Sequence, residues 1–491
     1  LDKPVLDYLP GFRMHDDYVT RHLTVRDLLC HRSGLPRHDA VWYGSEDSRE
    51  ELFQKLRYLA PNRGFREVFQ YQNLMYMTAG YLAGQLAHSS WEERVKTRIF
   101  QPLEMNRANF SIGAMQKDPD HAKPYNKEGD QVKRMDFRNI DAIGPAGSVN
   151  ASVEEMCHWL IAQLNGGKYE GAEIVSAASL AESHTPVIPV AGPLSGYLAF
   201  DNNGSPITYG LGWFISTHKG RPAIQHGGNI DGFSAMVAFL PQDSVGVVVL
   251  TNLNGTMLPA VIRNYIFDKM LGETVRDWNG EMLAMIRKME EQQEGQEEEE
   301  DLKRVKGTQP SHKLAAYGGT YSHPAYGDIT ISPKGDSLYF SYHTLEVALG
   351  HYHYDVFAGK SPLIGPVKVA FHTNIDGDVS RLSTVMEPAL DAIIFERKAE
   401  EEAFTEAELD AFTGEYLIMG AQKLTVSRKG GELQMTVPGQ PTYTLEYYKG
   451  LEFKLKGLNG YSALFQKAGS GKVSGLVMIQ PNGQFKGEKV E

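Results

Sequence analysis

Hydrophobic residues recur at helical spacing in several segments of the first half of the chain. After Ser152 they form one helical face that runs to Leu164 and stops at Asn-Gly-Gly, residues 165–167, a typical helix end. Four such segments open with a Ser or Thr followed three residues later by an acid, a pair that caps a helix start. The pairs are Thr24 and Asp27, Ser48 and Glu51, Ser90 and Glu93, and Ser152 and Glu155.

Between residues 207 and 253 the pattern changes to one that is typical of strands. Residues 207–215, 221–228, 233–241 and 245–253 are short apolar or alternating runs separated by turn residues. A helical face over residues 258–266 follows and ends by Gly272. Helices before and after consecutive strands predict an α+β domain, with helices packed on an antiparallel sheet.

The last third of the chain has little helical period and repeats itself. Eight positions recur 95 residues later without a slip: Leu314, Tyr317, Gly319, Tyr321, Ser332, Lys334, Gly335 and Leu338 match Leu409, Phe412, Gly414, Tyr416, Ser427, Lys429, Gly430 and Leu433. We therefore expect two copies of a small all-β module, over residues 311–400 and 401–491. Closure into a barrel, of the lipocalin-like kind, would remove exposed strand edges.

An acidic run separates these modules from the α+β part. Residues 290–301 hold eight acids and no base, so they repel one another and bury little apolar surface. The run predicts a solvated linker, over residues 286–310, or an exposed helix end. The domain expected before it spans residues 1–285.

Composition excludes several classes of protein. The 491 residues are 42% hydrophobic and carry a net charge of −12, which disfavours binding to nucleic acid through its phosphates. No apolar run is long enough for a transmembrane helix. The only two cysteines, Cys30 and Cys157, exclude a disulfide scaffold; we interpret them as buried thiols, although one bridge between them stays open.

Four stretches, taken in order, resemble one known family. They are residues 1–10 (LDKPVLDYLP), 31–36 (HRSGLP), 71–73 (YQN) and 226–228 (HGG). The chain resembles the serine β-lactamase and penicillin-binding-protein family over about residues 1–272, specifically its class C-like branch of esterases, D-amino-acid peptidases and carboxypeptidases. The resemblance implies a β-lactamase-like α+β fold that lacks its N-terminal part, and small β domains after it. It also implies a small-molecule substrate, no metal or organic cofactor, and an extracytoplasmic or secreted location.

The resemblance also implies roles for particular residues. Tyr71 would shuttle a proton to the leaving group, and Asn73 would position the substrate. His226 would stand where many relatives carry a lysine, so the cation that binds a substrate carboxylate is weakened at neutral pH. Taken alone, Y-x-N also fits an ordinary aromatic before a helix, and H-G-G fits a histidine before a turn.

The glycines after His226 extend this prediction. Gly227 and Gly228 would let the substrate approach the strand closely, and the main-chain N–H of Asn229 would stabilise an oxyanion.

The serine and lysine that the family mechanism needs are expected upstream of residue 1. The chain has one Ser-x-x-Lys, Ser216 to Lys219, but it ends a predicted strand, where residues three apart point to opposite faces. Ser33 and Ser148 have no lysine or histidine at useful spacing; we expect Ser33 to cap a turn and Ser148 to shape the site wall.

The stretch expected upstream would also supply part of the sheet. Without it, the sheet would have a bare edge and an uncovered apolar face, so residues 1–272 would be poorly stable or be completed by an N-terminal segment or a second chain.

Other features are weaker candidates for function. His351 and His353 share a strand face near Asp355, a pattern that zinc would accept, but no fixed third ligand is evident and side chains of a β module explain them better. The leading hypothesis is thus a serine hydrolase that forms an acyl-enzyme from an ester or a D-amino-acid peptide. The alternative is a catalytically inactive binding or scaffold protein derived from that fold. A homo-oligomer is compatible with either.

Overall fold

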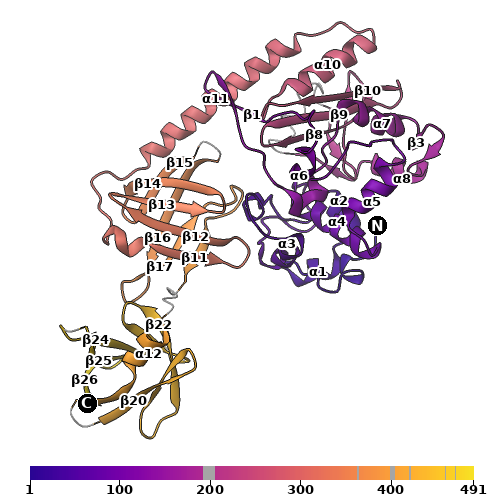
Figure 1. Ribbon diagram of the computed structural model, residues 1–491. Helices are drawn as coiled ribbons and strands as arrows, with labels where there is room; N and C mark the ends of the chain where they lie inside the picture. Colours follow the sequence, from indigo (N-terminus) through magenta and orange to yellow (C-terminus); the bar gives the residue numbers. More distant parts are fainter. Residues whose placement is uncertain are drawn as a thin grey trace.

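The computed structural model of the chain contains three folded parts, arranged one after another (Figure 1). It describes residues 1–191, 205–361, 364–398, 404–419, 422–458, 460–469 and 471–490. The first part is α+β and the other two are all-β, as the sequence patterns predict.

A six-stranded antiparallel sheet organises the first part, with the order β10-β9-β8-β7-β6-β5. Its strands are β5 (Ile188–Pro189), β6 (Thr208–Tyr209), β7 (Phe214–His218), β8 (Arg221–Ile230), β9 (Phe233–Leu240) and β10 (Val245–Thr251). The four predicted strand segments are confirmed, and the first of them splits into β6 and β7. Two short hairpins lie outside this sheet: β1 (Tyr125–Glu128) with β2 (Gln131–Arg134), and β3 (Lys168–Tyr169) with β4 (Ala172–Glu173).

Four helices of the first part begin at the predicted caps. Capping boxes form at Thr24, Ser48 and Ser152, whereas at Ser90 the hydroxyl accepts from the Glu93 N–H and no reciprocal bond is present. The helices are α1 (Asp17–His22), α2 (Val25–Leu29), α3 (Arg49–Lys55), α4 (Asn73–Leu86), α5 (Trp91–Val95), α6 (Ile112–Met115), α7 (Val153–Leu164), α8 (Ala177–Ser183), α10 (Leu258–Met270) and α11 (Trp278–Leu302).

Helices cover both faces of the sheet. Phe267 of α10 packs with Val247 of β10 on one face, in a cluster of buried apolar side chains. On the other face Leu160 of α7 packs with Phe239 of β9. A Cβ at Gly246 would lie 2.6 Å from Leu160 Cδ2, so any larger residue here requires the Leu160 side chain to shift.

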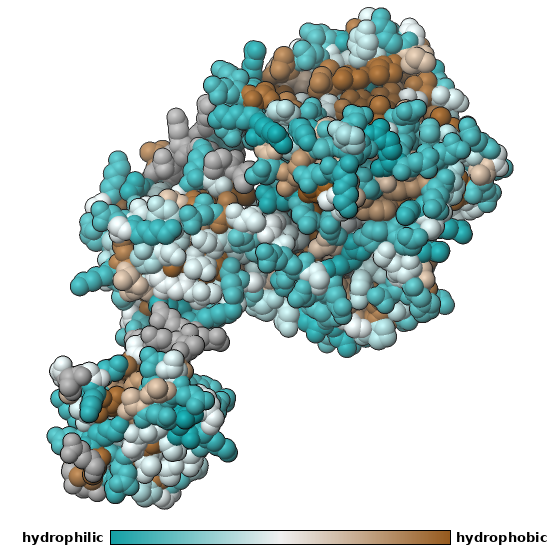
Figure 2. Space-filling model, viewed as in Figure 1, coloured by the Kyte–Doolittle hydropathy of each residue, from teal (hydrophilic) through white to brown (hydrophobic). Residues whose placement is uncertain are grey.

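Strands β10 and β5 are the two edges of this sheet among the described residues. Apolar side chains gather over β10 and α10 on the face shown in Figure 2. Leu250, Leu258 and Met270 are all more than a third exposed. Low stability of the first part stays a prediction.

Helix α11 carries the acidic run. The run therefore lies in the second half of a helix that begins at Trp278, before the predicted linker. None of the described helices combines the length and apolarity that crossing a membrane requires. Cys30 and Cys157 are free thiols; burial raises the pKa of Cys30 to about 11, whereas Cys157 is only partly buried.

The two β modules are closed eight-stranded barrels. The first contains β11 (Gly319–His323), β12 (Gly327–Lys334), β13 (Ser337–Tyr342), β14 (Leu345–His353), β15 (Val356–Ser361), β16 (Gly365–Thr373), β17 (Val379–Thr384) and β18 (Ile393–Arg397). The second follows helix α12 (Glu406–Phe412) and contains β19 (Gly414–Ile418), β20 (Gln422–Lys429), β21 (Glu432–Thr436), β22 (Thr442–Lys449), β23 (Glu452–Leu455), β24 (Ser462–Lys467), β25 (Val473–Gln480) and β26 (Gly483–Val490).

The sequence repeat is a structural repeat. Tyr321 donates a hydrogen bond of 2.9 Å to the Tyr317 carbonyl, and Tyr416 donates one of 2.7 Å to the Phe412 carbonyl. All four side chains are buried in the barrel cores, as expected from their recurrence.

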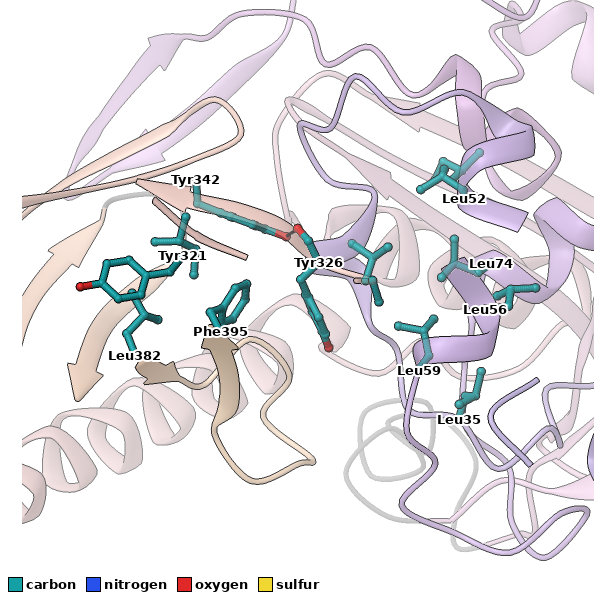
Figure 3. Packing of buried hydrophobic residues seen from close by; sticks show 14 of the residues in the cluster. Leu35, Leu52, Leu56, Leu59, Leu74, Tyr321, Tyr326, Tyr342, Leu382 and Phe395 are labelled. Carbon is teal, nitrogen blue, oxygen red and sulfur yellow. Dashed lines mark hydrogen bonds between the residues drawn. The ribbon is translucent and has the colours of Figure 1, made fainter. Parts of the chain in front are cut away.

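The first barrel shares a core with the α+β part. One cluster of buried side chains runs from Leu35, Leu56 and Leu59 into Tyr326 and Phe395 of the barrel (Figure 3). The second barrel has a core of its own.

Candidate active site

A cleft of about 1240 Å³ lies in the α+β part, between strand β8 and the start of helix α4. All six residues predicted for the site line this cleft: Tyr71, Asn73, His226, Gly227, Gly228 and Asn229. The rings of Tyr71 and His226 have centroids 6.1 Å apart, although 154 positions separate them in the chain. The structure thus brings together the two motifs that the sequence placed on different elements.

Tyr71 lies just before α4, where the helix start holds it against His31. The main-chain N–H of the N-cap residue Gln72 donates to His31 Nδ1 at 3.0 Å, and the Tyr71 and His31 rings are 4.3 Å apart. Burial raises the pKa of the Tyr71 phenol; the guanidinium of Arg37 opposes this rise and the carboxylate of Asp39 adds to it. The phenol is therefore protonated at neutral pH.

Asn73 is the first residue of α4, and its amide is bound to a loop that follows the HRSGLP motif. Asn73 Nδ2 donates to Asp39 Oδ1 at 3.1 Å, and Arg37 Nε donates to Asp39 Oδ2 at 2.6 Å. The Arg37 guanidinium carbon also lies 5.1 Å from the centre of the Tyr71 ring, within cation–π distance. Arg37 and Asp39 therefore hold the side chains of the Y-x-N motif in place.

His226 is neutral in this site. Since the carbonyl of Gly227 can only accept, His226 Nδ1 carries the proton and donates to it at 2.6 Å. His226 Nε2 then accepts from the Tyr209 hydroxyl at 3.2 Å. Burial lowers the pKa of His226, and the bond to Gly227 opposes this shift only in part. The ring thus supplies no positive charge at pH 7.

The hydrogen-bond pattern of the sheet determines which main-chain groups of β8 are free. Ile230 pairs with Phe233 across a two-residue turn, so bonds to β9 alternate from there along the strand. The alternation directs the N–H of Asn229 away from β9, and the pairing of β7 with β8 ends at Gln225. The Asn229 side chain is occupied differently, because its Oδ1 accepts from Ser234 and from the Gly255 N–H.

Three buried polar atoms at or beside the cleft have no hydrogen-bond partner among the described residues: His31 Nε2, Ser148 Oγ and Gln225 Oε1. Ser148 and Gln225 line the cleft, and the His31 ring touches Tyr71. Because His31 Nδ1 accepts, Nε2 carries a proton with no acceptor, and burial lowers the pKa of His31 well below its usual value. Unpaired buried polar atoms are uncommon, so this cleft has unused capacity for polar contacts.

The serines considered in the sequence lie as follows. Ser216 is on strand β7 and Lys219 is in the turn after it, where Lys219 Nζ pairs with Asp268 at 2.9 Å. Neither residue belongs to the described lining of the cleft, which agrees with their rejection as a catalytic pair. Ser33 Oγ accepts from the Leu35 N–H at 3.3 Å, so its predicted role as a turn cap is confirmed.

The His351–Asp355 segment is occupied by protein contacts. His351 Nε2 bonds to the Tyr354 carbonyl, and Asp355 accepts from Ser311 and Tyr317. In the described part of the chain, no cluster of three or more His, Cys, Asp or Glu side chains has the geometry of a metal site.

The sequence did not single out Arg37, Asp39 or Tyr209. Arg37 directly follows the HRSGLP motif, so a cation beside a motif was an available signal. No local pattern marks Tyr209, because its contact with His226 depends on the packing of β6 beside β7 and β8.

Comparisons with known proteins identify the family of the chain. The profile of the Beta-lactamase family matches residues 1–268, more than half of the chain. The chain belongs to the Beta-lactamase family. The profile of a domain of unknown function, DUF3471, matches residues 303–397, which include the first barrel.

The curated relatives of this Beta-lactamase family member are distant. Unguisins hydrolase ungD' of Aspergillus campestris is 25% identical over 350 residues, which are 65% of this chain and 61% of that protein. Protein flp of Staphylococcus aureus is 24% identical over 270 residues, 54% of this chain and 50% of that protein. The chain thus spans about three fifths or less of the length of these relatives.

Solved structures give two further likenesses. The octameric penicillin-binding protein homologue from Pyrococcus abyssi has a TM-score of 0.47 at 20% identity and covers 81% of this chain and 82% of its own. A D-stereospecific amidohydrolase from Streptomyces sp. has a TM-score of 0.44 at 20% identity, with 54% and 78% covered.

Proposed function

We propose that this chain provides two walls of the cleft of a serine hydrolase that forms an acyl-enzyme from an ester or a D-amino-acid peptide. The observation that carries the proposal is the meeting of Tyr71 and His226 in one cleft, with ring centroids 6.1 Å apart. Membership of the Beta-lactamase family supports the reaction class.

Each wall has a chemical role in this proposal. The protonated Tyr71 phenol donates its proton to the leaving group, and the Arg37 guanidinium above its ring stabilises the phenolate that remains. On the opposite wall, the Asn229 N–H donates to the oxyanion of the tetrahedral intermediate. Gly227 and Gly228 are exposed and carry no side chain, which leaves room for a substrate along β8.

The attacking serine and its lysine lie outside residues 1–491 in this proposal. The single Ser-x-x-Lys of the chain is away from the cleft. The unpaired His31 Nε2, Ser148 Oγ and Gln225 Oε1 are polar groups that an incoming element can satisfy.

Labelling with a fluorophosphonate tests the proposal. The reagent is applied to residues 1–491 and to the product of the same gene with all codons that precede Leu1. We expect a labelled serine upstream of Leu1 in the second protein and no label in the first. Absence of label from both proteins overturns the proposal and favours the scaffold alternative.

A substitution tests the role of Tyr71 in the protein that takes the label. Tyr71→Phe removes the proton donor and is expected to lower kcat for a 4-nitrophenyl ester by about 10²–10⁴-fold. Tyr81→Phe is the matched control, because Tyr81 lies on α4, the helix that begins two residues after Tyr71, and its ring packs on Phe53. Equal rates for the two variants contradict the assigned role.

A further inference from the structure

The boundary between the first barrel and the α+β part is built around His38. Its main-chain N–H donates to the buried Glu387 carboxylate at 2.8 Å. The Ala60 carbonyl accepts from Nε2 at 3.1 Å, so Nδ1 is unprotonated and accepts from the Tyr326 hydroxyl at 2.7 Å. Both Glu387 and Tyr326 belong to the barrel part, and Figure 3 shows Tyr326 between barrel side chains and leucines of the α+β part.

His38 also has an unusual backbone. Its φ of 49° lies in the left-handed region, which costs a non-glycine residue free energy unless its surroundings hold it there. The residues on either side, Arg37 and Asp39, are the ones that contact Tyr71 and Asn73. The barrel therefore holds the turn that carries Arg37 and Asp39, and with it their contacts to Tyr71 and Asn73.

Three further hydrogen bonds tie the barrel to the loop that contains His38 and to Arg138. The Tyr342 hydroxyl lies 2.9 Å from the Ala40 carbonyl. His343 Nδ1 donates to the Tyr43 carbonyl at 2.9 Å. Arg138 Nη1 donates to Thr344 Oγ1 at 3.1 Å.

The partners of these contacts reach the second wall of the cleft. Tyr43 donates to Asp231 at 2.7 Å, and Arg138 Nε donates to the same carboxylate at 2.6 Å. Burial, together with the Asp231 charge, raises the pKa of Tyr43 to about 12, so the phenol remains a donor. Asp231 begins the turn after β8, two residues beyond Asn229. The barrel is thus connected to the wall that carries His226 as well as to the wall that carries Tyr71.

We propose that the first barrel is a positioning domain for the cleft. Through Tyr326, Glu387 and residues 342–344 it fixes the positions of the loop 37–44 and of the turn after β8. These positions determine the distance between the two walls of the cleft. The structural part of this inference stands without the proposed function. Its catalytic consequence rests on that function.

Hydrogen–deuterium exchange of residues 1–491 tests the structural part. Tyr326→Phe leaves His38 Nδ1 without a donor, and we expect amide exchange in residues 36–44 to rise about fivefold or more. Tyr321→Phe is the matched control, because it removes a buried hydroxyl of the same barrel whose hydrogen bond among the described residues stays inside that barrel. Unchanged exchange in residues 36–44 of Tyr326→Phe, or an equal rise in the control, overturns the proposal.

A second variant avoids the risk that Tyr326→Phe unfolds the barrel. Thr344→Val removes one hydrogen bond to Arg138 at an exposed position and keeps the shape of the side chain. We expect faster exchange in residues 229–233, at the β8 turn, and none in the second barrel. Equal exchange at the β8 turn in variant and parent contradicts the link to that wall.

Kinetics test the consequence in the protein that takes the fluorophosphonate label. Per labelled site, Tyr326→Phe is expected to raise KM and to lower kcat by about tenfold, because misplaced walls bind and orient the substrate less well. A purely destabilising change lowers only the number of labelled sites and leaves both constants unchanged, as we expect for Tyr321→Phe. If no protein takes the label, the proposed function fails while the exchange experiment still decides the positioning role.

Discussion

Gly80→Ala is a substitution whose outcome depends on two opposed effects. Gly80 lies inside α4, the helix that begins at Asn73, and alanine in a helix interior is favoured over glycine by about 1 kcal/mol. The added Cβ, however, would lie 2.2 Å from Cγ and 2.3 Å from Cβ of Pro145, and 3.1 Å from Cδ1 of Trp91. A proline ring cannot rotate away, so either α4 or the 141–146 segment must move.

The overlap is expected to outweigh the gain in helix propensity. Overpacking of a core typically costs 1–3 kcal/mol, and two contacts near 2.2 Å place this site at the upper end or beyond. After the propensity gain, we expect a net loss of about 1–3 kcal/mol in the free energy of unfolding. For a part of this size, that loss lowers Tm by roughly 2–10 °C.

Differential scanning calorimetry measures this effect, with two controls inside the chain. The transition of the second barrel should not move, because its core is separate from that of the first part. Gly113→Ala in α6 adds a Cβ with no atom within 4 Å, and should leave Tm unchanged or raise it slightly. If Gly80→Ala is as stable as the parent chain, or more stable, the packing of α4 against Pro145 is not the constraint argued here.

Three other predictions concern substitutions of single residues. Burial lowers the pKa of His184 to about 4, so the unfolded chain takes up a proton first as the pH falls below about 6.5. The stability lost between pH 6.5 and 4 in urea unfolding should shrink in His184→Gln, and an unchanged pH dependence refutes this. Tyr321→Phe and Tyr416→Phe each remove an equivalent buried hydrogen bond and should lower the unfolding free energy of their barrels by similar amounts, about 1–2 kcal/mol. If the two losses of free energy differ by more than that amount, the barrels are not equivalent. Leu250→Lys places a charge on β10, an edge strand of the described sheet. It should reduce self-association of the chain through this edge, as measured by sedimentation velocity. A parent chain that is already monomeric at the same concentration contradicts edge pairing.

Much of the fold was predictable because its signals are local or periodic. The cap at Ser152 and the stop after Leu164 bound α7 as predicted, since capping bonds form within one turn of a helix. The 95-residue repeat predicted two alike modules, and the hydroxyls of Tyr321 and Tyr416 make the same contact in each. The acidic run was harder to interpret, because a charged sequence without an apolar face suits both a linker and an exposed helix.

The candidate site was predictable where a motif names its residues and unpredictable where a partner comes from another element. Tyr71 and His226 were identified from short motifs and do share one cleft. The sequence predicted a weakened cation at His226, but not the further lowering of its pKa, which follows from burial, nor the hydrogen bond from Tyr209 on another strand.

The sequence by itself determined the capped helices, the main strands of the sheet, the two repeated modules and the residues of two motifs, since caps, apolar spacing and repeats act over short stretches of chain. Only the tertiary structure decided that the first barrel holds His38, and through it Arg37 and Asp39, beside the Y-x-N motif. The physical reason is that these hydrogen bonds join residues about 290 to 350 positions apart. Such contacts depend on how whole domains pack, and no local pattern in the chain encodes them.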